Sequence, residues 1–354
     1  MSLMLDEIRQ QPDVLDRTLR QELRAVERLK KSLEARPPRF VTLAARGTSD
    51  NAALFGRYLL EITTRIPVSL AAPSIFTLYG SEVNYRDSLV VAISQSGEST
   101  DTNLVLERAR EQGALTVGIT NEPSSGLAKL AEHVLLVRAG REKSVAATKT
   151  FTGQLMMLYL LAYALGAPVD VEDLRAIPEW AAAALELEKE MGERAPRYRF
   201  MDHTVVVGRG LSYANAFEFA LKLMETCYVV AERFSSADFL HGPIAIVESS
   251  FPVFLFTPAG VTWPAMREMV EKLRSTGAET LLITDRSNPE AGKTSRRPVV
   301  VPARLSSRRG PLPGEIYSPI PYIIPAQIFA ALLAVEKGLN PDQPRGLTKV
   351  TRTL

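Results

Sequence analysis

The chain contains one structural unit twice, and this internal repeat constrains its fold more than any other feature of the 354 residues. Apolar runs in the first half end in loops that contain Gly47 and Gly97, and the counterparts Gly210 and Gly260 each lie 163 positions further along. Four runs in one order at a nearly constant offset indicate a duplicated fold. The matching runs are 40–45 with 203–207, 89–93 with 253–256, 113–120 with 277–284, and 133–137 with 298–301.

These runs are continuously apolar rather than alternating, which is typical of strands in a parallel sheet covered on both faces. Residues 100–112 and 263–276 place apolar side chains at helical spacing between the runs. The pattern predicts an α/β fold of two tandem doubly wound, flavodoxin-like parallel-sheet domains. The expected divisions are a helical N-terminal arm at 1–36, a first domain at 37–166, a helical linker at 167–199, a second domain at 200–335 and a C-terminal tail at 336–354.

Composition and charge exclude several classes of partner. The formal net charge of +2, and the balanced charges of the arm, favour a solvated N-terminal helix and argue against nucleic acid. The single cysteine, Cys227, excludes an intrachain disulfide and a cysteine-rich zinc site, and the three histidines lack metal-motif spacing, so we expect no metal. The longest apolar helix candidate, 153–165, has 13 residues, whereas a membrane span needs about 20. Without a secretory signal, these features predict a cytoplasmic protein with no membrane partner.

Polar loops follow two predicted strands of the first domain, at the edge where such sheets bind ligands. The segment 94–99 supplies three hydroxyls and one amide at the start of a helix, whose N–H groups suit a phosphate. Thr48 and Ser49 follow a neighbouring strand. The segment has no Lys or Arg, so the expected cradle is neutral. A serine that only caps the helix is the alternative for any single residue, but the cluster favours anion binding.

The second domain differs at the equivalent loop. Thr257–Gly260 has few hydroxyls, and Pro258 lacks an N–H donor, so this half is predicted to supply other chemistry. Glu218, Lys222 and Glu225 share one helical face at i, i+4 and i+7, a spacing that usually marks a solvated charged stripe. Their position after a glycine-rich loop makes catalysis the competing interpretation. His241 is a candidate acid–base group, whereas Cys227 is predicted to pack among apolar neighbours.

Taken together, these segments resemble the sugar isomerase (SIS) family. Within it, they are most similar to the isomerase half of the glutamine–fructose-6-phosphate aminotransferases, also called glucosamine-6-phosphate synthases. The resemblance runs from about residue 4 to residue 354. Its motifs are residues 94–98 (SQSGE), 145–149 (VAATK), 218–225 (EFALKLME), 241–243 (HGP) and 342–349 (DQPRGLTK).

The resemblance implies a role for each matching residue. The substrate-binding set comprises Ser94, Gln95, Ser96 and Ser99 for the phosphate, and Thr48, Ser49 and Val145 for the sugar or phosphate. The catalytic set comprises Glu225 as the base, Lys222 at the hydroxyls, Glu218 as support, His241 for ring opening across a dimer interface, and Lys349 at the carbonyl or as an imine. These residue types suit isomerisation, because one carboxylate can move a proton between adjacent carbons. Histidine titrates near neutrality, and a lysine can condense with a carbonyl.

The expected reaction depends on two departures from the aminotransferases. Only about 36 residues precede the first predicted strand, with no cysteine near the start, so we expect no glutaminase. Arg46 stands where the synthases usually have Cys. Both departures favour a stand-alone deaminase that converts glucosamine 6-phosphate to fructose 6-phosphate and ammonia, without a cofactor, as a homodimer with a shared active site.

Two alternatives remain open. The first is an aminotransferase-like enzyme, a deglycase or a ketose–aldose isomerase of the same fold that acts on another sugar phosphate. The second is a sugar-phosphate-binding regulator without catalysis. A regulator would not need the base, so the presence of Glu225, Lys222, His241 and Lys349 favours an enzyme.

Overall fold

The computed structural model describes residues 2–295 and 297–349, and these residues form two compact units. Each unit is built around one five-stranded sheet in which all neighbouring strands are parallel. We call them the first sheet unit, residues 13–142, 149–175 and 347–349, and the second sheet unit, residues 2–12, 143–148 and 176–346.

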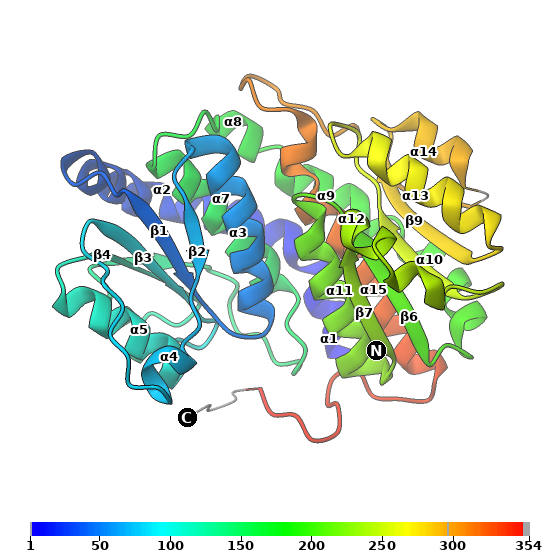
Figure 1. The fold of residues 1–354 in the computed structure, drawn as a ribbon, viewed down its shortest axis with the longest axis horizontal. Coiled ribbons are helices and arrows are strands. Elements are labelled where there is room, and N and C mark those ends of the chain that lie inside the picture. Colours follow the sequence, from blue (N-terminus) through cyan, green and yellow to red (C-terminus); the bar gives the residue numbers. More distant parts are fainter. Residues whose placement is uncertain (1, 296, 350–354) are drawn as a thin grey trace. The chain divides into compact units, whose positions relative to one another are not determined.

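The first sheet unit has the strand order β2-β1-β3-β4-β5, which reverses between β1 and β3 as in flavodoxin-like folds. Helix α3 packs beside α7 (Figure 1). The strands are β1 (Phe40–Ala44), β2 (Val68–Leu70), β3 (Ser88–Ile93), β4 (Leu115–Thr120) and β5 (His133–Leu136). The helices are α2 (Gln11–Ala35), α3 (Thr48–Thr64), α4 (Ser74–Thr77), α5 (Thr100–Glu111), α6 (Gly126–Leu130), α7 (Lys149–Ala164) and α8 (Val171–Leu174).

The second sheet unit repeats this order as β7-β6-β8-β9-β10, and helix α11 packs beside α15 (Figure 1). The strands are β6 (His203–Gly208), β7 (Val230–Ser235), β8 (Pro252–Phe256), β9 (Glu279–Asp285) and β10 (Val299–Val301). The helices are α1 (Leu3–Arg9), α9 (Ile177–Leu185), α10 (Glu188–Arg194), η1 (Ala195–Tyr198), α11 (Ser212–Cys227), α12 (Ser236–Leu240), η2 (Pro243–Ile246), α13 (Trp263–Ser275), α14 (Pro289–Thr294), η3 (Gly314–Tyr317) and α15 (Pro319–Glu336).

The predicted class of two tandem doubly wound α/β domains is therefore confirmed. All eight predicted strands are present, but the sequence interpretation missed β2 and β7. Both are edge strands with partly exposed side chains, so neither produces a continuous apolar run.

The N-terminal arm consists of two helices rather than one solvated helix. Helix α1 ends at Arg9, and α2 buries Val14, Leu19 and Val26. The buried carboxylate of Glu22 on α2 accepts the Leu136 N–H of β5 (3.1 Å). The expectation of a solvated arm is wrong in this respect, because the apolar residues recur at helical spacing and pack one face of α2.

Helix α15 is longer and more apolar than the segment that the sequence indicated as the longest apolar helix. By length and composition it could cross a membrane, but 83% of it is buried inside the protein, as expected for a core helix. Its interior Pro325 lacks an N–H donor, and prolines also stand at 319 and 321. The sequence interpretation expected a closing helix and a tail from Tyr317 onward, and α15 lies in this segment.

Candidate active site

The loop that follows β3 has a shape set by glycine and by its own hydroxyls. Ser94 Oγ accepts the Gly97 N–H (3.1 Å), and Ser96 Oγ accepts the Glu98 N–H (3.3 Å). Gly97 has a φ of +67°, and a Cβ there would collide with Ser125. Only glycine fits this position without strain. The loop therefore turns tightly into α5 at the point where the strand order reverses, which is where ligands bind in such sheets.

An ion pair lies at the first turn of α5. Ser99 is the N-cap residue but its hydroxyl makes no capping bond, and it donates instead to Asp101 Oδ1 (3.0 Å). Arg46 Nε donates to Asp101 Oδ2 (2.6 Å). Burial would raise the pKa of Asp101, but the bonds from Arg46 and Ser99 outweigh it and lower the pKa. Arg46 lies outside the segment 94–99, and Asp101 balances its charge, so the expectation of a neutral cradle stays a prediction.

Thr48 and Ser49 begin α3, directly after the loop that follows β1. Thr48 is half-buried, whereas Ser49 is buried and its Oγ accepts from Gln154 Nε2 of α7 (2.9 Å). The predicted binding role of Ser49 thus competes with a bond to the interior.

A cavity of about 640 Å³ opens beside the β3 loop. Of the predicted phosphate-binding residues, Gln95 and Ser96 line it. The remaining lining residues are polar or charged apart from a glycine, and they are Glu98, Asn121, Glu122, Ser124, Ser125, Gly140, Arg141 and Glu142.

Glu142 is a site residue that the sequence interpretation missed. Its carboxylate is fully buried, and its Oε2 accepts from Gln95 Nε2 (3.1 Å), Thr150 Oγ1 (2.7 Å) and Lys349 Nζ (2.8 Å). Glu142 thereby connects the predicted phosphate loop to the predicted C-terminal lysine. The only hint in the sequence is that Glu142 stands three residues before the motif that starts at Val145.

In the second sheet unit, α11 brings three predicted catalytic residues together. Lys222 Nζ lies 3.4 Å from Glu218 Oε1 and 2.6 Å from Glu225 Oε2. The side chains of Glu218 and Lys222 are 0% exposed, and that of Glu225 is 22% exposed. The solvated-stripe interpretation is therefore wrong, because α15 packs against α11.

The electrostatics of this cluster keep Lys222 protonated. Burial alone would lower the pKa of Lys222, but the carboxylates of Glu218 and Glu225 outweigh burial and raise it above its ordinary value. Lys222 therefore acts as a fixed cation, and Glu225 is the member of the cluster that solvent can reach.

The second-domain loop that matches the phosphate loop holds a carboxylate of the chain itself. Glu315 Oε2 accepts the Val261 N–H (2.8 Å), and Thr262 Oγ1 donates to the other oxygen. Gly260 has a φ of +139°, and a Cβ there would collide with Glu315. Burial raises the pKa of Glu315 despite these bonds. An internal anion thus lies at the start of α13, in the repeat where the sequence showed few hydroxyls.

The other residues singled out from the sequence, Val145, His241 and Cys227, lie outside the groups described above. The Val145 N–H donates to the Asp342 carbonyl (3.1 Å), within the second sheet unit. His241 is exposed at the end of α12, and its side chain has no hydrogen bond to any residue among 2–295 and 297–349. Its predicted action across a dimer interface stays a prediction. Cys227 is buried and its Sγ donates to the Ala330 carbonyl (3.2 Å), which agrees with a packing role.

Comparison with known proteins identifies the family. The SIS domain profile matches residues 37–164 and 201–304, one match in each repeat. The chain belongs to the SIS domain family. The resemblance inferred from the sequence motifs is therefore confirmed.

Individual SIS proteins show how similar this chain is to others. The glutamine–fructose-6-phosphate aminotransferase of Methanothermobacter thermautotrophicus is 35% identical over 309 residues, which cover 87% of this chain and 51% of that protein. The chain spans about half the length of the curated relatives it matches.

Two solved structures share the SIS fold along nearly the whole chain. The C-terminal domain of the glucosamine-fructose-6-phosphate aminotransferase from Francisella tularensis has a TM-score of 0.84 and 28% identity, covering 97% of this chain and 98% of that chain. Glucosamine-6-phosphate deaminase from Thermotoga maritima has a TM-score of 0.77 and 23% identity, covering 99% and 100%, and shows the fold alone.

Proposed function

We propose that this chain is a sugar-phosphate isomerase that converts glucosamine 6-phosphate to fructose 6-phosphate and ammonia. The observation that carries the proposal is the buried Glu218–Lys222–Glu225 cluster, in which one carboxylate is open to solvent. The similarity to aminotransferases that act on fructose 6-phosphate supports the substrate class. The polar loop after β3 supplies hydroxyls for a phosphate.

In this reaction, Glu225 moves a proton between carbons 2 and 1 of the open-chain substrate. Removal of the proton from carbon 2, with protonation of the carbon 1 oxygen, forms an enolamine. Return of the proton to carbon 1, with loss of a proton from the nitrogen, leaves an imine at carbon 2. Water adds to the imine carbon and ammonia departs, which gives the ketose. A carboxylate can serve both carbons. The ammonium of Lys222, 2.6 Å from Glu225 Oε2, holds this carboxylate in a fixed position on α11.

The other residues have supporting roles in this proposal. Ser94, Gln95, Ser96 and Ser99 bind the phosphate, and Thr48, Ser49 and Val145 contact the sugar or phosphate. His241 opens the ring, Lys349 contacts the carbonyl carbon or condenses with it, and Glu218 holds Lys222 in place.

A coupled assay of ammonia release and fructose 6-phosphate formation tests the reaction. We expect both products from glucosamine 6-phosphate in equal amounts. Isomerisation of unaminated sugar phosphates without ammonia release would instead favour a ketose–aldose isomerase. Sugar-phosphate binding with no turnover of any phosphorylated sugar would favour a regulator.

The Glu225→Gln variant tests the assigned base. We expect it to lose turnover but to keep sugar-phosphate binding in calorimetry, since it removes the base and not the phosphate donors. The exposed Glu271→Gln on α13 is a matched control that should leave both unchanged. Turnover of Glu225→Gln at the wild-type rate would refute the role.

The proposed action of His241 across a dimer is tested by mixing two inactive variants. If His241 serves the partner's active site, refolded mixtures of His241→Ala with Glu225→Gln should regain about a quarter of the wild-type activity, because half of the dimers then carry one intact site. Activity that stays absent in mixtures shown to exchange subunits would place His241 and Glu225 of one chain in the same site.

A further inference from the structure

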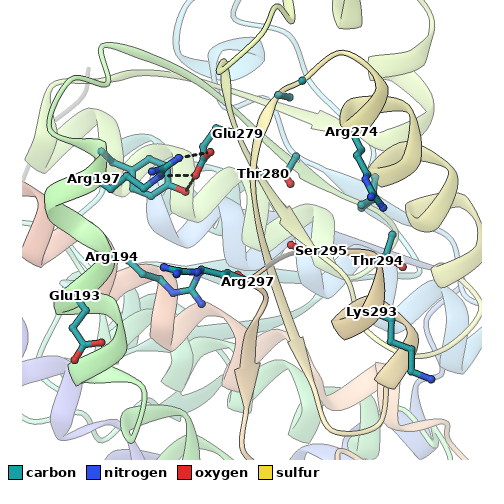
Figure 2. Close-up of a pocket in the computed structure, with 14 residues that line it drawn as sticks. Glu193, Arg194, Arg197, Arg274, Glu279, Thr280, Lys293, Thr294, Ser295 and Arg297 are labelled. Carbon is teal, nitrogen blue, oxygen red and sulfur yellow. Dashed lines mark hydrogen bonds and ion pairs between the residues drawn. The ribbon is translucent and has the colours of Figure 1, made fainter.

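A second cavity lies at the end of the second sheet where the strands begin. The loops described above lie at the other end, where the strands finish. The cavity has a volume of about 680 Å³ and opens at the amino ends of β9 and β10, whereas ligands of such sheets bind at the carboxyl ends. Its walls come from α10 and η1, from the ends of α13 and α14, and from the segment before β10 (Figure 2). We call it the amino-edge cavity.

One wall of this cavity is fixed by ion pairs and backbone contacts. Arg197 donates to both carboxylate oxygens of Glu279 (2.9 and 2.8 Å), and Tyr198 Oη donates to Oε1 (3.3 Å). The hydrogen bond from Arg197 lowers the pKa of Glu279. Arg194 Nη1 donates to the Arg297 carbonyl (2.7 Å), which ties α10 to the segment before β10. Glu279 is therefore already neutralised, and Glu193, the second carboxylate of the lining, lies 4.0 Å from the ammonium of Lys189 on the same helix.

Three further cations line the cavity without such neutralisation. Arg274, Lys293 and Arg297 are exposed, and none has a carboxylate within ion-pair distance among residues 2–295 and 297–349. Figure 2 shows Arg274 reaching down from α13 toward the end of α14, and Arg297 on the other side, beside Arg194. Thr280, Thr294 and Ser295 add hydroxyls to the lining. The surplus of positive charge over a polar floor favours an oxyanion.

We propose that the amino-edge cavity binds a small molecule that carries a diphosphate group. Cations from three separate segments can contact more than one phosphoryl group at once, and the planar guanidinium of arginine binds phosphate oxygens in pairs. A volume of about 680 Å³ is typical of small-molecule sites and leaves room beyond the diphosphate. The diphosphate can come from inorganic pyrophosphate or from a nucleoside diphosphate.

Stabilisation of helix carboxyl ends also explains part of this positive charge, and it determines which control variant is needed. Lys272 and Arg274 lie in the last turn of α13, and Lys293 lies in the last turn of α14, where cations stabilise the helix carboxyl end. This explanation does not cover Arg297, which lies outside any helix. Lys272 shares the turn of Arg274 but does not line the cavity, so it separates the two explanations.

Calorimetric titration at low salt tests the proposal, with inorganic pyrophosphate and ADP as probes and inorganic phosphate as the comparison. We expect both diphosphates to bind more tightly than phosphate, and tighter binding of ADP would show that the nucleoside part is also contacted. Arg274→Gln and Arg297→Gln should each raise the Kd for pyrophosphate roughly tenfold. Lys272→Gln should leave it unchanged, and all three variants should keep wild-type unfolding midpoints.

Three results would overturn the proposal. The first is an absence of diphosphate binding to the wild-type protein at millimolar concentration. The second is an equal loss of affinity in Lys272→Gln and Arg274→Gln, which would indicate diffuse attraction to a basic surface. The third is retained affinity in both Arg274→Gln and Arg297→Gln, which would show that the diphosphate binds elsewhere, for example at the loop after β3.

Discussion

Replacing Glu142 by Gln should disconnect Lys349 from the β3 loop with almost no change in side-chain volume. Oε2 of Glu142 accepts three donors, and Oε1 accepts the Thr150 N–H (3.1 Å). A glutamine must direct its NH₂ group at one of these positions. It then either faces the Lys349 ammonium and the Gln95 amide, or faces the Thr150 N–H. Both arrangements set a donor against a donor, and both remove the negative charge.

The size of the expected loss of kcat follows from the hydrogen bond between Glu142 and Lys349. At 2.8 Å, with the carboxylate fully buried and Lys349 23% exposed, it is a charge-assisted hydrogen bond. Such bonds contribute about 1.5–3 kcal/mol. Since about 1.4 kcal/mol corresponds to a factor of ten, the population with Lys349 held in place should fall about tenfold to a hundredfold. If Lys349 acts on the substrate carbonyl from this position, kcat should fall by a similar factor.

The assay is steady-state turnover of glucosamine 6-phosphate by wild type, Glu142→Gln, Lys349→Met and the double variant. We expect the double variant to be no slower than Lys349→Met alone, because both changes act on one contact. Glu122→Gln, which lines the same cavity but is exposed, is the control and should keep its kcat. A kcat of Glu142→Gln within twofold of wild type, or multiplying effects in the double variant, would refute the reasoning.

Three further predictions concern buried groups. Lys222→Met removes the ammonium that Glu218 and Glu225 face, so the free energy of unfolding in urea should fall by about 3–5 kcal/mol, and adding Glu218→Gln should restore part of it. Burial raises the pKa of Glu315 above its ordinary 4.5. The free energy of unfolding of the wild type should therefore fall relative to that of Glu315→Gln as the pH rises from 4.5 through the folded-state pKa. A difference between the two proteins that does not change between pH 4.5 and neutrality would contradict this. Burial raises the pKa of the Cys227 thiol to about 11, so a thiol reagent at mildly alkaline pH should modify Cys227 only after unfolding, and rapid modification of the native protein would count against a packing role.

Much of the fold follows from local pattern. The apolar runs that became β3 and β4 are fully buried strands, and the predicted amphipathic helices became α5 and α13. The two missed strands, β2 and β7, are edge strands with one partner each. Edge position alone does not explain the omission, because β5 and β10 are also edge strands and were predicted from their mostly apolar runs. Strand β2 contains Ser69, and β7 contains Glu232 and Arg233, so the composition of both strands resembles that of a loop.

In the candidate site, too, the local features could be predicted from the sequence and the long-range contacts could not. The loop at 94–99 could be identified because a strand, polar residues and a helix follow one another in the chain. The contacts of Arg46 with Asp101, Val261 with Glu315, and Glu142 with Lys349 join residues 55, 54 and 207 positions apart. No local pattern marks such pairs, because they depend on which strand ends lie together in the sheet.

The sequence by itself determined the duplicated α/β architecture, the strand ends at which the polar loops stand, and the spacing of Glu218, Lys222 and Glu225 on one helical face. It left open whether that face was a solvated charged stripe or a buried cluster. Only the tertiary structure decided this, because burial depends on what packs against a helix. Helix α15, about a hundred residues further along the chain, packs against α11 and leaves Lys222 with two carboxylates in place of water.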